Sequence, residues 1–147
     1  MPSRSASVAS AVMAVVTVGT LAACVVGKDA PVRPSGPWMR PGEVGEMTAA
    51  YATLRNAARD TLRIVAVEID AAGHASLHRT VDSAGTARMV PVDTLAIAPG
   101  DSAAMAPGGL HVMAHGLRVR LLPGDTVAVR FLGARGDTTV VRALVRQ

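Results

Sequence analysis

Cysteine and aromatic residues are almost absent from this chain of 147 residues, which contains one Cys, one Trp, one Tyr and one Phe. A single cysteine leaves no disulfide within the chain. Nucleic-acid binders usually cluster positive charge and add aromatic side chains that stack on bases. Here the net charge of +4 comes from arginines that are scattered from Arg55 to Arg146. We therefore expect no nucleic-acid partner.

The sequence also lacks the usual marks of an enzyme. It has no nucleophile at a recognisable spacing from a base, no glycine-rich phosphate loop and no carboxylate pair in a motif. We therefore expect a protein that is not an enzyme.

Residues 1–23 read as an export signal and not as part of the fold. Arg4 supplies a short positive region, and residues 8–22 form an apolar run that is too short to span a membrane. The run ends in Leu21-Ala22-Ala23-Cys24, which resembles the bacterial lipobox. The alternative is an ordinary signal peptide with an incidental cysteine. Because the only cysteine of the chain lies at the cleavage position, we expect a cleaved signal and a lipidated Cys24.

Lipidation at Cys24 predicts a protein anchored on the periplasmic side of a bacterial membrane. No Asp follows the cysteine as a retention signal, which by analogy favours the outer membrane. Residues 24–37 are rich in proline and glycine, and we expect them to form a flexible tether. The folded domain is then expected to span residues 38–147. An acylated thiol cannot bind a metal, so any soft-metal site would use thioether and imidazole.

The remainder of the chain predicts an all-β domain. Short extended runs alternate with Pro-Gly and Gly-Asp turn signals, a pattern typical of an antiparallel β-sandwich. We expect strands over residues 48–54, 61–69, 76–81, 88–97 with an interruption at Pro91, 110–117, 126–132 and 138–145. Only residues 42–50 could carry a helical turn.

Histidine and methionine are the residues with metal-binding chemistry after Cys24. There are four histidines, His74, His78, His111 and His115, and five methionines, Met39, Met47, Met89, Met105 and Met113. His111 and Met113 are two residues apart in an expected strand, so they face the same side. Imidazole with thioether suits a soft cation such as Cu(I). We expect Met39, Met47 and Met105 to fill the core, and His74 to be solvated in a loop.

The spacing of four of these residues is more specific. Ten residues separate His78 from Met89, twenty-one separate Met89 from His111, and one separates His111 from Met113. This pattern resembles the motif of PCuAC, a family of periplasmic copper chaperones that serve cytochrome c oxidase assembly. The flanking runs from Arg88 to Val92 and from Pro107 to Met113 look like family sequence. The resemblance covers Trp38 to about Val145.

The resemblance implies a cupredoxin-like (Ig-like) β-sandwich with one exposed Cu(I) site. It assigns ligand roles to His78, Met89, His111 and Met113. The expected copper acceptor is cytochrome c oxidase subunit II or a thiol-bearing assembly factor. The chain departs from the family at His115, where relatives often have Met. His115 is four residues from His111, which corresponds to about 13 Å along a strand. We therefore expect His115 to lie beside the copper without binding it.

Some PCuAC members carry a His- and Met-rich tail that holds Cu(II), and no such tail precedes Gln147. We therefore expect a single copper. Two other functions are compatible with the sequence, a copper-sequestering lipoprotein for metal tolerance and a metal-free structural sandwich of the envelope. Metal analysis separates the structural protein from the copper binders, and transfer to an oxidase domain separates delivery from sequestration.

Overall fold

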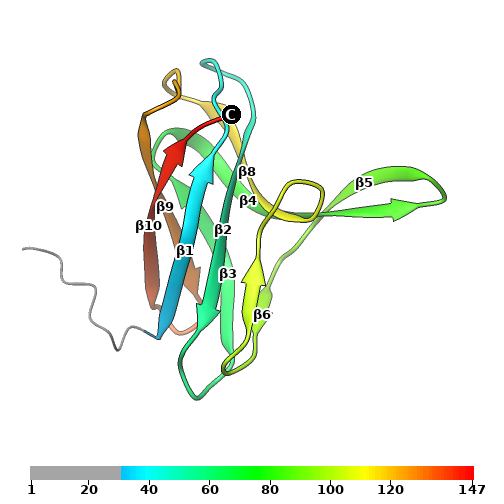
Figure 1. Ribbon diagram of the computed structural model, residues 1–147, viewed down its shortest axis with the longest axis vertical. Helices are drawn as coiled ribbons and strands as arrows, with labels where there is room; N and C mark the ends of the chain where they lie inside the picture. Colours follow the sequence, from blue (N-terminus) through cyan, green and yellow to red (C-terminus); the bar gives the residue numbers. More distant parts are fainter. Residues whose placement is uncertain (1–30) are drawn as a thin grey trace, which may run out of the picture.

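The computed structural model describes residues 31–147, which fold into ten β-strands (Figure 1). The expected signal peptide and Cys24 lie outside the described residues. The strands are β1 (Val32–Met39), β2 (Thr48–Asn56), β3 (Leu62–Ile69), β4 (Ala72–Ser83), β5 (Thr86–Pro91), β6 (Leu95–Ile97), β7 (Ser102–Ala104), β8 (Leu110–Leu117), β9 (Thr126–Gly133) and β10 (Thr138–Val145). In this part of the chain no helix is long and apolar enough to cross a membrane.

All the strands belong to one sheet, which folds over so that its two halves pack against each other as a sandwich. The strand order is β5-β4-β8-β2-β1-β10-β9-β3-β6, and β7 pairs separately with β2. The predicted all-β sandwich is thus confirmed. One detail differs, because β1 and β10 run parallel where they pair, at Trp38 with Leu144 and Met39 with Val145. The remaining strand pairs are antiparallel, as expected.

The alternation of apolar residues along the strands produces the core. In β9, the side chains of Val127, Val129 and Phe131 are buried while their neighbours along the strand are more exposed. Val112 and Leu54 are fully buried on the other side of the sandwich. Each such side chain contributes about 1.5–3 kcal/mol through its removal from water. The few aromatics therefore do not prevent a core, because valine and leucine supply the buried area.

The folded domain begins earlier than the sequence indicated. Residues 32–37 were predicted to belong to the tether, but they form most of β1 and pair with β2 from Val32 opposite Asn56 onward. The strand tolerates its prolines because it pairs with β10 only at Trp38 and Met39. Its register with β2 also shifts between Ser35 and Trp38, where Gly36 takes a φ of 55°. That irregularity accommodates the Gly-Pro pair that suggested a linker.

Strands β4 and β5 form a hairpin that extends away from the sandwich (Figure 1). Every residue of β5 is exposed, and its partner in the sheet is β4. The turn consists of Ala84 and Gly85, both with positive φ, which is the geometry that two-residue hairpin turns favour. The Asp82 side chain accepts a hydrogen bond from the Gly85 N–H at 2.9 Å. The inner half of β4 is therefore part of the sandwich, and its outer half belongs to the hairpin.

Asn56 joins several loops at one end of the sandwich. Its side chain is completely buried and donates to the carbonyls of Asp60 (2.7 Å) and Ile97 (2.9 Å). Its amide oxygen accepts from the Ala58 N–H at 2.9 Å. All three side-chain hydrogen bonds are to backbone groups, so Asn56 fixes the connections around β2, β3 and β6 without any charge.

Candidate metal centre

The pairing of β4 with β8 places six polar or sulfur-containing side chains on one face of the sheet. His78 lies opposite His111, Ser76 opposite Met113, and His74 opposite His115. Residues two apart on a strand face the same side, so all six share a face. The alternate residues of both strands, among them Leu77 and Val112, are buried in the core. The six therefore lie on the outer face, which we call the histidine face.

Met89 reaches this face from the hairpin. It pairs with Thr80, which is two residues beyond His78 on β4, so Met89 lies diagonally next to His78 on the same side. Together with His111 and Met113, it lines a hollow of about 380 Å³. His78 does not line the hollow, but its ring centroid lies 6.2 Å from that of His111. The structure thus brings all four predicted ligands to one patch.

His111 is held in a defined orientation. The residue is only 5% exposed, and its Nδ1 donates a hydrogen bond to the Gly109 carbonyl at 2.9 Å. Because Nδ1 carries the proton, the lone pair of the imidazole is on Nε2. A histidine that binds a metal usually has its other ring nitrogen fixed in this way. The turn before β8, which contains Gly108 and Gly109, therefore supplies the acceptor that fixes the ring.

His78 has a buried nitrogen that the protein itself leaves without a partner. Among the described residues, its Nδ1 is buried and makes no hydrogen bond. Such an atom costs about 1–3 kcal/mol when it has no partner. Burial lowers the pKa of His78 from its ordinary value of 6.5, and the nearby His111, His115 and His74 lower it further. The imidazole is thus kept in the neutral form that binds metals.

His115 also lies close to His78, across the β4–β8 pair. The ring centroids of these two residues are 6.2 Å apart, the same distance as between His78 and His111. The hydroxyl of Ser76 lies between them, 3.4 Å from Nε2 of His78 and 3.5 Å from Nε2 of His115. The expected separation of about 13 Å lies between His111 and His115 along β8, whereas His78 faces them from the neighbouring strand β4.

Two of the three methionines expected in the core are found there. Met39 and Met105 are buried, as predicted. Met47 is not, because it is 62% exposed and lines the same hollow as Met89, His111 and Met113. It directly precedes β2, whose side chains alternate between the two faces, and that alternation places it outside. His74 is exposed as expected, although it belongs to β4 and not to a loop.

Aromatic side chains extend the histidine face across the sheet. Tyr51 on β2 lies 6.5 Å from the ring of His111, and Trp38 on β1 stacks on Tyr51 at 4.4 Å. The guanidinium of Arg146 lies 4.8 Å from the centre of the Trp38 ring. Trp38 and Tyr51 could not be placed beside the site from the sequence, because only the pairing of β1, β2 and β8 makes them neighbours.

Thioethers are essential to a metal site in the hollow beside His111. In the part of the chain that the structure describes, no three His, Cys, Asp or Glu side chains are close enough to hold a metal alone. The hollow is lined by neither aspartate nor glutamate. An ion that binds in this hollow must therefore accept sulfur from methionine, which is a property of soft cations.

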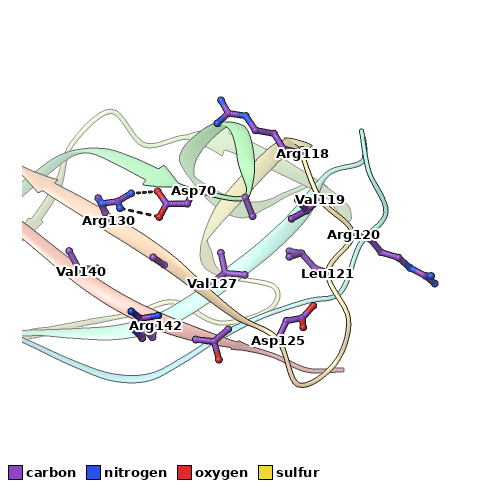
Figure 2. A pocket seen from close by; sticks show the side chains of 13 residues that line it. Asp70, Arg118, Val119, Arg120, Leu121, Asp125, Val127, Arg130, Val140 and Arg142 are labelled. Atoms are coloured by element: carbon purple, nitrogen blue, oxygen red, sulfur yellow. Dashed lines mark hydrogen bonds and ion pairs between the residues drawn. The ribbon is translucent and has the colours of Figure 1, made fainter.

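A larger hollow, of about 620 Å³, lies elsewhere on the surface, beside β9 and β10 (Figure 2). It is surrounded by Arg118, Arg120, Arg130 and Arg142, and Arg130 donates two hydrogen bonds to the Asp70 carboxylate. It shares no residue with the hollow on the histidine face, and its lining contains no histidine or methionine. The soft-metal chemistry is thus confined to the histidine face.

Comparison with known proteins agrees with this arrangement. The family model of LpqE-like lipoproteins matches residues 32–145, from the first residue of β1 to the last of β10. No curated protein matches the sequence significantly. Among solved structures, a copper-bound PCuAC domain from PmoF2 is 20% identical with a TM-score of 0.65, over 80% of this chain and 93% of that domain.

Two structures of DR1885 from Deinococcus radiodurans are also similar. The apo form is 26% identical with a TM-score of 0.59, over 97% of this chain and 96% of that protein. The form with Cu(I) is 28% identical with a TM-score of 0.54, over 75% and 76% of the two chains. The chain belongs to the LpqE-like family, and it shares the fold of the PCuAC domains, which its resemblance to the PCuAC family implied.

Proposed function

We propose that this protein is an extracytoplasmic lipoprotein that binds one Cu(I) and delivers it to another copper protein. The observation that carries the proposal is the convergence of His78, Met89, His111 and Met113 on one face, from strands β4, β5 and β8. These four side chains would hold the ion. They offer two imidazoles and two thioethers, all neutral, which is a donor set for a soft ion of low charge.

The local chemistry supports copper at this place. His111 presents Nε2 because its Nδ1 donates to the Gly109 carbonyl, and His78 has a buried nitrogen without a partner. Both features are those of ligands prepared for a metal. Two proteins of similar fold are known with copper, namely the PmoF2 domain and DR1885 with Cu(I). Both support copper as the cargo here.

The placement of Met89 supports delivery over permanent storage. Met89 is 61% exposed and lies on β5, which contacts the remainder of the sheet through β4. A partner can approach this ligand from solvent. Neutral donors on an open face can be replaced one at a time by thiolates or imidazoles of an acceptor. The proposed acceptor is cytochrome c oxidase subunit II or a thiol-bearing assembly factor.

The proposed location follows from the N-terminal sequence and the family. Leu21 to Cys24 resembles a lipobox, and the matching family consists of LpqE-like lipoproteins. We propose that Cys24 carries the lipid, that this lipid anchors the protein in the outer membrane, and that the domain faces the periplasm.

A Cu(I) titration against a competing chelator tests the binding site. The wild-type protein should bind one equivalent, and the variants His111→Ala and Met113→Ala should each bind at least tenfold more weakly. His74→Ala is the matched control, because it removes an exposed imidazole outside the proposed ligand set and should leave Cu(I) affinity unchanged. Equal weakening in all three variants, or no binding by the wild type, would show that the assigned residues do not form the site.

Transfer is tested separately. The Cu(I)-loaded protein is mixed with the soluble copper domain of oxidase subunit II, the two are separated, and copper in each is measured. Delivery predicts movement of copper to the acceptor within minutes. Retention of all copper by this protein would instead support sequestration.

A further inference from the structure

The geometry points to a second metal site on the histidine face, formed by His74 and His115, which takes a borderline divalent cation of the Cu²⁺ class. The two residues lie directly opposite each other in the β4–β8 ladder, and neither belongs to the proposed Cu(I) ligand set. Directly opposed residues of antiparallel strands have Cβ atoms about 4.5–5.5 Å apart, close enough for both side chains to reach one ion.

The ring positions fit chelation. The centroids of His74 and His115 are 5.8 Å apart, with an angle of 33° between the ring planes. An imidazole nitrogen lies about 2.0–2.1 Å from a bound ion, so two rings on one ion have centroids at most about 6.5 Å apart. The separation of the two rings is therefore within the range that a shared ion allows. Both residues are also accessible, since His74 is exposed and His115 is half-buried.

The donors at this pair differ from those of the Cu(I) site. Met113 and Met89 line the hollow with His111, and neither His74 nor His115 lines it. Ser76 separates the two places, with its hydroxyl between Nε2 of His78 and Nε2 of His115. The pair thus supplies two imidazoles, and water can complete the coordination. Imidazole without thioether suits divalent copper or zinc, and Cu²⁺ binds such donors most tightly.

The expectation of one copper per chain then applies to Cu(I) alone. The chain would hold oxidised copper at His74 and His115, beside the place proposed for reduced copper. This second site does not depend on the proposed function, because its residues and its ion are different.

A double titration tests the proposal on the intact protein in detergent. The protein is first loaded with one equivalent of Cu(I) without oxygen. Cu²⁺ is then added against a competing chelator and followed by electron paramagnetic resonance. We expect one equivalent of Cu²⁺ with nitrogen hyperfine structure. His74→Ala and His115→Ala should each weaken Cu²⁺ binding at least tenfold, and His74→Ala should leave Cu(I) affinity unchanged. Met89→Ala should show the reverse pattern.

The outcomes separate the two proposals. Unchanged Cu²⁺ affinity in His74→Ala, a loss in only one of the two histidine variants, or dependence on His111 in place of His74 would overturn the second site. Failure of the wild type to bind Cu(I), with Cu²⁺ binding still dependent on His74 and His115, would overturn only the Cu(I) proposal. Thermal unfolding of each variant confirms that it is folded, and His74 is exposed, so its removal disturbs no packing.

Discussion

Met113 and His115 alternate on β8 and share the histidine face, yet we assign them to different ions. Met113 lines the hollow with Met89 and His111, whereas His115 points its Nε2 towards Ser76. Met113→Ala should therefore lower Cu(I) affinity by more than tenfold, because it removes a direct donor. His115→Ala should keep Cu(I) affinity within about tenfold, or about 1.4 kcal/mol. Chelator competition on the two variants measures both. Equal losses, or the reverse order, would contradict the assignment at this end of the motif.

The lowered pKa of His78 makes the copper-free protein sensitive to acid. In the unfolded chain His78 takes up a proton near pH 6.5, whereas in the folded chain it does so only at a lower pH. Between these values the unfolded state binds more protons, so the free energy of unfolding decreases as the pH falls through this window. Asp70, whose pKa is lowered by its hydrogen bond from Arg130, loses its stabilising contribution only below pH 3.8.

Urea unfolding at several pH values between 7.5 and 5 measures this effect. The copper-free wild type should lose stability across the range, and His78→Gln should lose less. A variant with the full acid sensitivity of the wild type would mean that another group is responsible.

Asn56 should be the most sensitive polar position in the fold. Asn56→Ala removes three side-chain hydrogen bonds at a fully buried position and leaves their backbone partners unsatisfied. We expect a loss of about 2–4 kcal/mol in the free energy of unfolding, measured by urea denaturation. Asp60→Ala is the control, because its carboxylate pairs only with the exposed Arg135. Cu(I) affinity of the folded fraction should stay unchanged in both, since neither residue lies on the histidine face.

The β4–β5 hairpin, which carries Met89, contains a turn residue that can be improved. Ala84 has a φ of 53°, a conformation that alanine adopts at a cost and glycine adopts freely. Ala84→Gly should therefore stabilise the hairpin by about 0.5–1 kcal/mol, and Ala84→Val should destabilise it. Amide hydrogen exchange of residues in β5 reports the change locally. Slower exchange in Ala84→Val than in the wild type would contradict the assigned turn geometry.

Most of the strands could be predicted because their sequences alternate and end in strong turn signals. The segments 110–117 and 138–145 match β8 and β10 to the residue. The run from 88 to 97 forms two strands, β5 and β6, and the predicted interruption at Pro91 is confirmed. Strand β7 was not predicted, because its three residues are stabilised by pairing with the distant β2. Strand β1 was missed because its prolines and glycine predict a linker. Only its pairing with β2 and β10 makes this segment a strand.

The candidate ligands could be predicted from spacing, whereas their neighbours could not. A linear pattern identifies His78, Met89, His111 and Met113 without any knowledge of the sheet. The proximity of Trp38, Tyr51 and Met47 depends on the pairing of β1, β2 and β8, which no short pattern in the sequence encodes.

For the whole molecule, the lipid anchor and the copper site should be separable. Cys24→Ser should release the protein from membranes, because it removes the proposed acylation site, and should leave Cu(I) affinity unchanged. Membrane fractionation and the chelator titration measure the two effects. An Ala22→Ser substitution in the lipobox that leaves Cys24 in place serves as the control. A Cys24→Ser protein that stays with the membrane would contradict the anchor.

The early start of β1 also shortens the reach of the proposed anchor. Only residues 25–31 separate Cys24 from β1, which corresponds to at most about 25 Å of extended chain. The histidine face is near the Trp38 end of β1, away from Val32, where the preceding chain joins (Figure 1). The copper site would then face away from the anchored end, towards partners that approach from the periplasm.

The row of rings from Trp38 through Tyr51 to His111 has an optical consequence. Trp38 is the only tryptophan in the chain, so all indole emission comes from one position. Only the ring of Tyr51 lies between Trp38 and the proposed ligand His111 in this row. Copper ions quench nearby indoles, and Arg146 lies against the indole ring. If copper binds as proposed, Trp38 would report metal loading by its fluorescence, and the proposed release of copper to an acceptor could be followed in real time without an added label.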